Sequence, residues 1–206
     1  MRGWWIALVL CLAVGSSHPA LAEDAATGGA KGQTLEQLEK LEGEAAGATE
    51  APAAEPLTKA KAAAVDPKGA APLDDPLTCL ARTIYWEAKG EDVAVMEGVA
   101  NVVMNRLADG SYPQTICEVV TQGEDGGPCQ FSWWCDGSSD QVEEPDRYAI
   151  TTEVARRALN QELADRTDGA LFFHGSADTP DWAAKMTKTA TVGDLVFYRP
   201  KGTGGG

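Results

Sequence analysis

Histidine is scarce in this sequence. Only His18 and His174 occur, and His18 lies in an N-terminal stretch that is expected to be removed. A catalytic zinc ion usually takes two or three histidines, and a serine or cysteine nucleophile usually takes a histidine base. The sequence also contains no Gly-x-Ser-x-Gly turn and no phosphate-binding Gly-x-x-x-x-Gly-Lys loop. We therefore expect neither a metal nor a cofactor.

Positive charge and long apolar runs are also in short supply. The 17 Lys and Arg residues are outnumbered by 31 Asp and Glu residues, and the net charge is −14. Acidic residues exceed basic ones both before and after residue 77, so no basic patch is available to neutralise nucleic-acid phosphates. No stretch is uniformly apolar over the ~20 residues that a membrane-spanning helix requires. Neither nucleic acid nor a stable membrane span is expected.

Residues 1–22 have the pattern of a signal peptide. Arg2 precedes an apolar run from Trp4 to Val14, and Ala20 and Ala22 provide the small residues that a signal peptidase requires. This pattern predicts an exported protein, periplasmic or extracellular, whose mature chain begins at Glu23.

Residues 23–76 contain no aromatic residue and are dominated by Ala, Gly, Pro, Glu and Lys. Such a composition buries too little apolar surface to offset the entropy of folding, which predicts a disordered linker. Leu35, Leu38 and Leu41 are spaced three apart, so a short helix there could bind an envelope protein partner. The alternative interpretation is a solvated tether.

The composition changes at Leu77, and residues 77–206 hold nearly all the aromatics of the mature chain. Helical spacing of apolar residues, with capping and stop signals, predicts helices at residues 77–88, 92–109, 113–121 and 145–165. Residues 123–137 are expected to form an irregular loop. Residues 170–174 and 195–198 are short β-prone runs that could pair. The predicted fold is α+β and mainly helical, with a small β-sheet.

Four cysteines remain after the signal: Cys79, Cys117, Cys129 and Cys135. In an oxidising compartment an even number favours two disulfides, although sequence alone allows three connectivities. A structural zinc site is the alternative, but no Cys-x-x-Cys pair is present.

Carboxylates are plentiful, and they suit acid/base cleavage of glycosidic bonds. Glu87 is distinctive because it follows Trp86 on the apolar side of the first predicted helix, near the negative end of that helix's dipole. Desolvation and the dipole would both raise its pKa, as a general acid requires. The alternative is a structural glutamate that is tied to a helix cap or to Arg106.

Several motifs resemble, in order, those of the cell-wall hydrolase family typified by spore-cortex-lytic enzymes. The matching runs are Cys79 to Glu91, Val102 to Arg106, Tyr112-Pro113, Cys129 to Gly137, Gly169 to His174, Trp182 and Val196 to Tyr198. The resemblance implies a lysozyme-like domain over residues 77–206, cleavage of the peptidoglycan glycan strand, and Glu87 as the catalytic acid. It departs at Phe172 and Leu195, where many relatives carry histidine, so substrate preference and rate are not carried over.

The placement of the cysteines in two family-like pairs implies bridges from Cys79 to Cys117 and from Cys129 to Cys135. The loop 123–137 would then form one wall of a glycan groove opposite Glu87. Flat aromatic rings and amide or hydroxyl groups can bind sugars, whereas the alternative for the aromatics is core packing and for the polar residues loop capping. The candidate substrate-binding residues are Gln130, Phe131, Ser132, Trp133, Trp134 and His174.

Three functions remain. In a lytic transglycosylase, Glu87 would cleave between N-acetylmuramic acid and N-acetylglucosamine to give 1,6-anhydro products, with no second carboxylate. A lysozyme-type hydrolase would need one, such as Asp136. A catalytically silent peptidoglycan-binding module would keep the fold without the activity.

Overall fold

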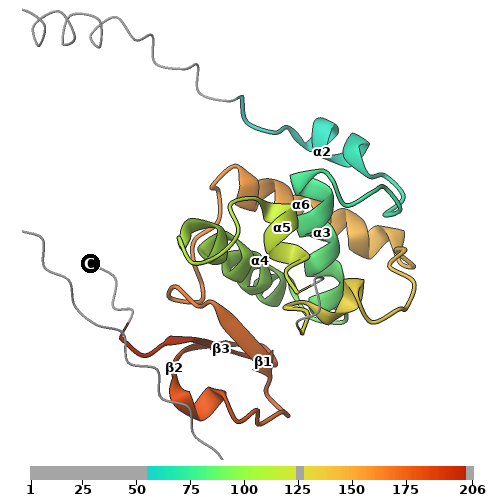
Figure 1. Cartoon of the computed structure of the whole chain (residues 1–206). Coiled ribbons are helices and arrows are strands. Elements are labelled where there is room, and N and C mark those ends of the chain that lie inside the picture. Colours follow the sequence, from blue (N-terminus) through green and yellow to red (C-terminus); the bar gives the residue numbers. More distant parts are fainter. Residues whose placement is uncertain (1–54, 124–127, 203–206) are drawn as a thin grey trace, which may run out of the picture. The chain divides into compact units, whose positions relative to one another are not determined.

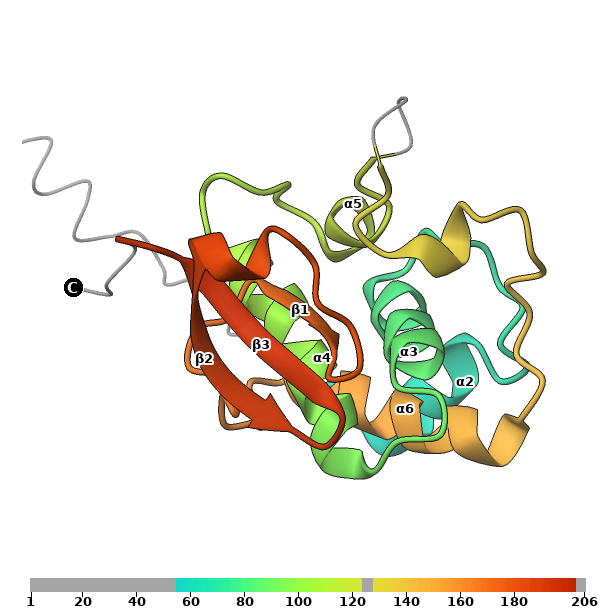
Figure 2. The same cartoon turned by 90° about the horizontal axis from the view of Figure 1, so that it is seen from below.

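The computed structural model describes residues 55–123 and 128–202, which form a mainly helical α+β domain with one small sheet (Figures 1 and 2). The predicted fold class is therefore confirmed. The helices are α2 (Lys59–Val65), α3 (Pro76–Glu87), α4 (Val93–Ala108), α5 (Ile116–Val120) and α6 (Pro145–Leu159), with 3-10 turns η1 (Ser132–Trp134) and η2 (Ala183–Lys185). The strands are β1 (Phe172–Gly175), β2 (Met186–Val192) and β3 (Leu195–Pro200). No helix in these described ranges has both the length and the apolar character needed to cross a membrane.

The central helix of the domain is α3. Asp75 caps it by accepting hydrogen bonds from the backbone N–H groups of Leu77 and Thr78, and Pro76 occupies its first turn. Residues 77–85 are all buried, because α4, α5 and α6 pack around α3. Its C-terminal end is consequently held rigidly in the middle of the domain.

Both predicted disulfides are present. Cys79 is bonded to Cys117, which ties α3 to α5. The bond between Cys129 and Cys135 closes a short ring, residues 129–135, that contains η1. We call this segment the disulfide ring.

The predicted helices exist, with two shifted boundaries. Thr115 caps α5, which therefore starts at Ile116 rather than at residue 113. α6 ends at Leu159 instead of extending to residue 165, because Asn160 turns to bond the backbone of Leu57 and Gln161 adopts a positive φ of 58°. Helical backbone cannot continue through that conformation.

The sheet is antiparallel, with strand order β1-β3-β2. The predicted pairing of residues 170–174 with 195–198 is seen in β1 and β3, where His174 lies opposite Val196. β3 packs on α4 through Phe197, which lies over Gly98; a Cβ atom on Gly98 would be only 2.8 Å from the Phe197 ring. The glycine thus lets the sheet approach the helices closely.

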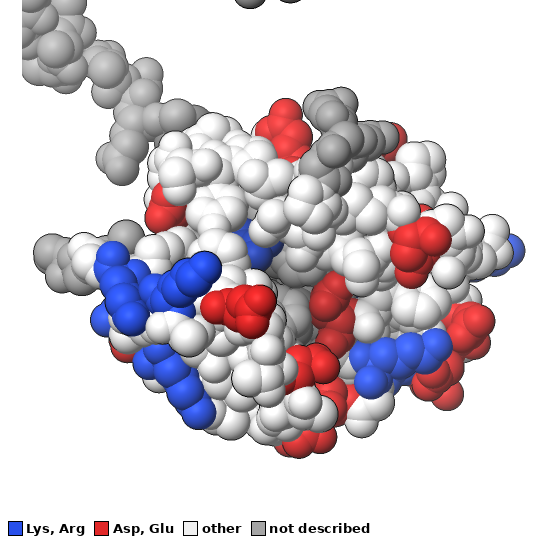
Figure 3. Space-filling view, turned by 60° about the horizontal axis from the view of Figure 1, so that its bottom comes forward, with Lys and Arg blue, Asp and Glu red and all other residues white. Residues whose placement is uncertain are grey.

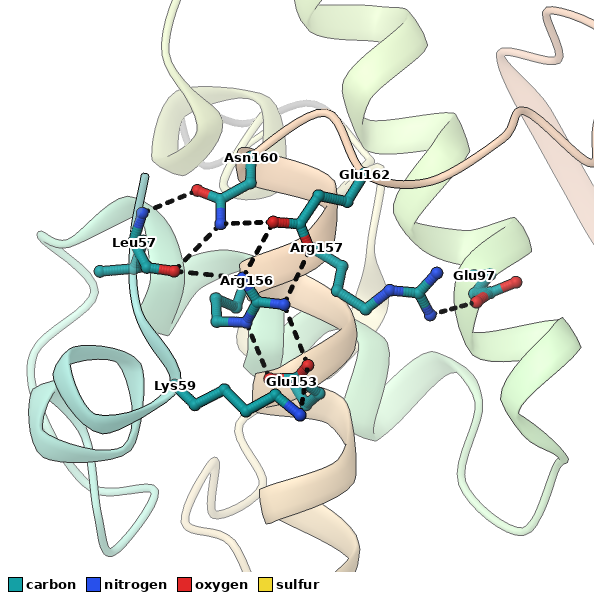
Figure 4. Close-up of polar contacts among 8 residues, drawn as sticks. All are labelled: Leu57, Lys59, Glu97, Glu153, Arg156, Arg157, Asn160 and Glu162. Atoms are coloured by element: carbon teal, nitrogen blue, oxygen red, sulfur yellow. Dashed lines mark hydrogen bonds and ion pairs between the residues drawn. The ribbon is translucent and has the colours of Figure 1, made fainter. Parts of the chain in front are cut away.

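Residues 55–76 correct the predicted linker boundary at residue 76, because this segment folds onto the domain. The backbone of Leu57 is held by Asn160 and Arg156, and Lys59 pairs with Glu153 (Figure 4). We call residues 55–76 the N-terminal strap. Residues 1–54, which include the predicted signal peptide and the rest of the linker, lie outside the described residues.

A buried carboxylate anchors the strap. Asp66 accepts hydrogen bonds from Tyr148 Oη at 2.8 Å and Arg82 Nε at 3.4 Å, as well as from the backbone N–H groups of Ala70 and Ala71. Burial opposes ionisation of Asp66, but these four hydrogen bonds hold its pKa below the usual value. The ionised side chain therefore joins the strap to α3 and α6.

Candidate active site

A cavity of about 580 Å³ lies between the end of α3, the end of α4, the disulfide ring and the sheet. We call it the central cavity. The space-filling view shows that this face of the molecule is hollowed (Figure 3). The residues that line the cavity are Glu87, Arg106, Pro128, Cys129, Gln130, Ser132, Phe172, Phe173, Trp182 and Met186.

Glu87, the last residue of α3, is partly buried at the wall of this cavity. Burial raises its pKa to about 7, and the positive charge of Arg106 only partly opposes that effect. Within residues 55–123 and 128–202 its carboxyl group forms no hydrogen bond or ion pair. A carboxyl group in this state can donate a proton near neutral pH and take one back.

Among the described residues that line the cavity, Arg106, near the end of α4, is the only cation. It is 3% exposed, and its Nε donates to the carbonyl of Leu171 at 2.8 Å. The guanidinium lies 5.0–5.6 Å from the ring centroids of Tyr112, Phe131 and Phe172. Its charge is thus stabilised by aromatic faces rather than by a carboxylate.

No ion pair joins Arg106 to Glu87 in the described structure. The alternative in which Arg106 ties Glu87 down is therefore not what the structure shows. The positive charge of Arg106 lowers the pKa of Glu87 without an ion pair between them. The carboxyl oxygens of Glu87 therefore remain available to a ligand.

The disulfide ring forms one wall of the central cavity. Gln130 and Ser132 line the cavity with Glu87, and their contact with substrate stays a prediction. Phe131 does not: it is 1% exposed, lies in the hydrophobic core and packs under Arg106. Its predicted contact with substrate is therefore wrong.

The two tryptophans of the ring also differ from expectation, since neither lines the central cavity. Trp133 is 6% exposed and belongs to the core, and Trp134 is partly buried against it. Burying a large apolar side chain lowers the free energy relative to exposing it to solvent. The two tryptophans of the disulfide ring therefore point toward the core.

Trp182 lines the central cavity, and His174 and Tyr198 pack against it. The Nδ1–H of His174 donates to the Gly175 carbonyl at 2.8 Å, while Nε2 lies 3.1 Å from Tyr198 Oη and accepts from it. His174 stacks on Tyr198 and meets the edge of Trp182, and of these three only Trp182 reaches the cavity. His174 therefore supports Trp182 from behind.

Several cavity residues were not singled out as ligands by sequence reasoning, among them Phe173, Trp182 and Met186. Trp182 stood only in the motif resemblance, and Met186 begins a strand that was not predicted. Asp136, the candidate second carboxylate, does not line the central cavity. Among the described residues that line it, Glu87 is the only carboxylate. Nor does the described part of the chain bring three or more His, Cys, Asp or Glu side chains together as a metal site.

Residues 90–198, just over half of the chain, match the cell wall hydrolase family. The chain belongs to this family. The matched segment covers the domain from the start of α4 through most of β3, so it includes Arg106, the disulfide ring and the sheet. Glu87 precedes the matched segment by three residues, and its role therefore rests on the geometry above.

Curated relatives of this cell wall hydrolase include two spore cortex-lytic enzymes. The one from Halalkalibacterium halodurans is 28% identical over 127 residues, which is 60% of this chain and 34% of the relative. The one from Bacillus cereus is 26% identical over 123 residues, or 58% of this chain and 42% of the relative. The chain thus spans well under half of the length of either relative.

Two solved catalytic domains are also similar to this cell wall hydrolase. The SleB catalytic domain from Bacillus cereus gives a TM-score of 0.47 at 23% identity, covering 60% of this chain and 89% of that one. The domain of the germination-specific lytic transglycosylase SleB from Bacillus anthracis gives a TM-score of 0.47 at 22% identity, covering 61% and 95%.

Proposed function

We propose that this cell wall hydrolase is an exported peptidoglycan glycosidase that works as a lytic transglycosylase, with Glu87 as its acid and base. The carrying observation is that Glu87, with a pKa raised to about 7, is the only carboxylate among the described residues of the central cavity. The relatives' names, spore cortex-lytic enzymes, support the same class of substrate. Residues 1–22 would direct export.

The first step follows from the protonation state of Glu87. Its carboxyl group donates a proton to the oxygen between N-acetylmuramic acid and N-acetylglucosamine, the C1–O bond breaks, and an oxocarbenium-like centre develops at C1. The carboxylate left on Glu87 is then stabilised by the positive charge of Arg106. Gln130 and Ser132 offer amide and hydroxyl groups that can orient the sugars, and Trp182 offers an aromatic face.

The second step needs only a base. The Glu87 carboxylate removes the proton of the muramic acid C6 hydroxyl, and that oxygen bonds to C1 to give a 1,6-anhydro sugar. The proton returns to Glu87, so the enzyme is regenerated without water. Hydrolysis with Asp136 as the second carboxylate is less well supported, because Asp136 lies in a different pocket.

The test is mass spectrometry of muropeptides that the full chain releases from purified sacculi. We expect products lighter by one water than hydrolysis products and resistant to borohydride reduction. Reducible muramic acid ends would instead establish a hydrolase. Binding to sacculi with no release of soluble muropeptides would establish a silent module and overturn the proposal.

A further inference from the structure

A second pocket, of about 330 Å³, lies beside the central cavity. We call it the lateral pocket. It is formed by the end of α3, the disulfide ring and the segment that leads into α6. The lining residues are Trp86, Lys89, Trp133, Asp136, Ser138, Ser139 and Glu143.

The two pockets are neighbours because consecutive residues face different ones. At the end of α3, Trp86 lines the lateral pocket and Glu87 the central cavity. In the disulfide ring, Ser132 lines the central cavity and Trp133 the lateral pocket. The Trp86–Glu87 and Ser132–Trp133 pairs therefore form a boundary shared by the two pockets, which a substituent on a sugar bound at Glu87 would pass to enter the lateral pocket.

The polar groups of the lateral pocket carry both signs of charge. The Lys89 ammonium lies 2.9 Å from Glu143 Oε2 and 4.8 Å from the centroid of the Trp86 ring. Asp136 accepts one hydrogen bond, from the backbone N–H of Ser138 at 2.7 Å, which leaves further acceptor capacity on its carboxylate. Lys89, Asp136 and Glu143 are all exposed and accessible to a ligand.

We propose that the lateral pocket binds the stem peptide of the muramic acid whose glycosidic bond Glu87 cleaves. A stem peptide branches from the muramic acid and presents carboxylates together with the ammonium group of a diamino acid. Lys89 would pair with a carboxylate, and Asp136 and Glu143 with the ammonium. Lys89 and Glu143 pair with each other, but neutral sugar would offer no charged partner to Asp136, so a peptide fits better than an extension of the glycan. This inference rests on the proposed function.

The experiment compares two substrates, glycan strands that carry stem peptides and strands from which an amidase has removed them. The variants are Lys89→Gln and Asp136→Asn. Asp74→Asn, an exposed carboxylate that lines neither pocket, is the matched control. We expect each pocket variant to lose about tenfold or more in kcat/KM on peptide-bearing strands, which is the loss of one charge-assisted hydrogen bond. On stripped strands the variants and the control should match the wild type.

Each outcome has a distinct meaning. If the wild type cleaves neither substrate, the proposed function fails. If the variants keep full activity on peptide-bearing strands, the stem-peptide site is wrong and the function stands. If they lose activity equally on both substrates while their melting temperatures are unchanged, the lateral pocket holds glycan. Titration of the folded variants with free stem peptide gives a second measurement, in which weaker binding than the wild type supports the inference and equal binding overturns it.

Discussion

Glu87 combines two features that seldom coexist on one side chain, burial that favours its neutral form and freedom from hydrogen-bonding partners among the described residues. We expect Glu87→Gln to lower glycan cleavage by about 10²–10⁴-fold, because the amide is nearly isosteric but cannot donate the proton. Release of soluble muropeptides measures the effect, and Glu91→Gln, which lines neither pocket, is the control. Activity within a few-fold of wild type would remove Glu87 from the mechanism.

The same substitution should change how stability depends on pH. The pKa of Glu87 is about 7 in the folded chain and near 4.5 when exposed, so the folded state keeps a proton that the unfolded state has lost. Wild-type stability should therefore fall as pH rises between these values, whereas Glu87→Gln has no proton to lose. Relative to wild type, the variant should gain on the order of 2–3 kcal/mol from pH 4 to pH 8. Urea unfolding at both pH values measures this difference, and a gap that is independent of pH would contradict it.

If Glu87 is the acid, its burial and, to a smaller extent, the charge of Arg106 set the upper end of the working pH range. Its charge lowers the pKa of Glu87, so Arg106→Met should raise that pKa and move the alkaline limb of kcat/KM to higher pH. Arg106→Lys keeps the charge and should leave the limb close to its wild-type position. A pH profile on soluble glycan strands distinguishes a field effect from simple packing, which would reduce the rate of both variants without moving the limb.

At the scale of elements, the disulfide ring places Trp133 in the core and Ser132 at the central cavity, although sequence reasoning made both candidate substrate-binding residues. Trp133 is 6% exposed in the core, so Trp133→Ala should destabilise the domain by about 3–5 kcal/mol. Ser132→Ala, by contrast, removes an exposed side chain at the cavity and should weaken glycan binding with little effect on stability. Thermal melts together with binding to stripped glycan strands test both statements. A stable Trp133→Ala with weak binding would restore the groove assignment.

The sequence indicated the elements better than the direction of their side chains. The cap Asp92 and the Lys89-Gly90 stop after α3 are local signals, and they indicate helix positions without tertiary information. The inward rotation of Phe131 and Trp133 depends on where the core lies, which no local pattern encodes. Glu87 could be predicted from the sequence because its immediate neighbours indicate both its burial and its position at a helix end.

Two elements were missed for different physical reasons. β2 alternates Thr with Lys, Ala and Val and has no fully buried residue, so it lacks the apolar periodicity that marks a strand. The Gly193-Asp194 turn before β3 was the available signal. The N-terminal strap is nearly devoid of large apolar residues. It is held mainly by polar contacts, among them those of the buried carboxylate Asp66 with residues 82 and 148 and those of the Leu57 backbone with Asn160.

At the scale of the whole molecule, the N-terminal strap extends the folded domain to residue 55, although the composition of residues 55–76 predicted a disordered linker. A chain of residues 77–206 would leave Arg82 and the hydroxyl of Tyr148 buried without Asp66. We expect it to be about 3–5 kcal/mol less stable than a chain of residues 55–206, because a buried charge loses its partner. Asp66→Asn in the longer chain should reproduce much of the loss. Urea midpoints of the three proteins measure it, and equal midpoints would show that the strap is dispensable.

The bond between Cys129 and Cys135 makes the shape of the central cavity depend on the redox state of the compartment that holds the protein. The wall that holds Gln130 and Ser132 opposite Glu87 is a short ring that only an oxidised cysteine pair can close. In a reducing cytoplasm that ring would be open, and its residues would lack the constraint of the bond. Under the proposed export, the cavity is completed only after the protein has left the cell compartment that made it. If the proposed export and activity hold, the need to form the Cys129–Cys135 bond would keep the enzyme incomplete until it has left the cytoplasm.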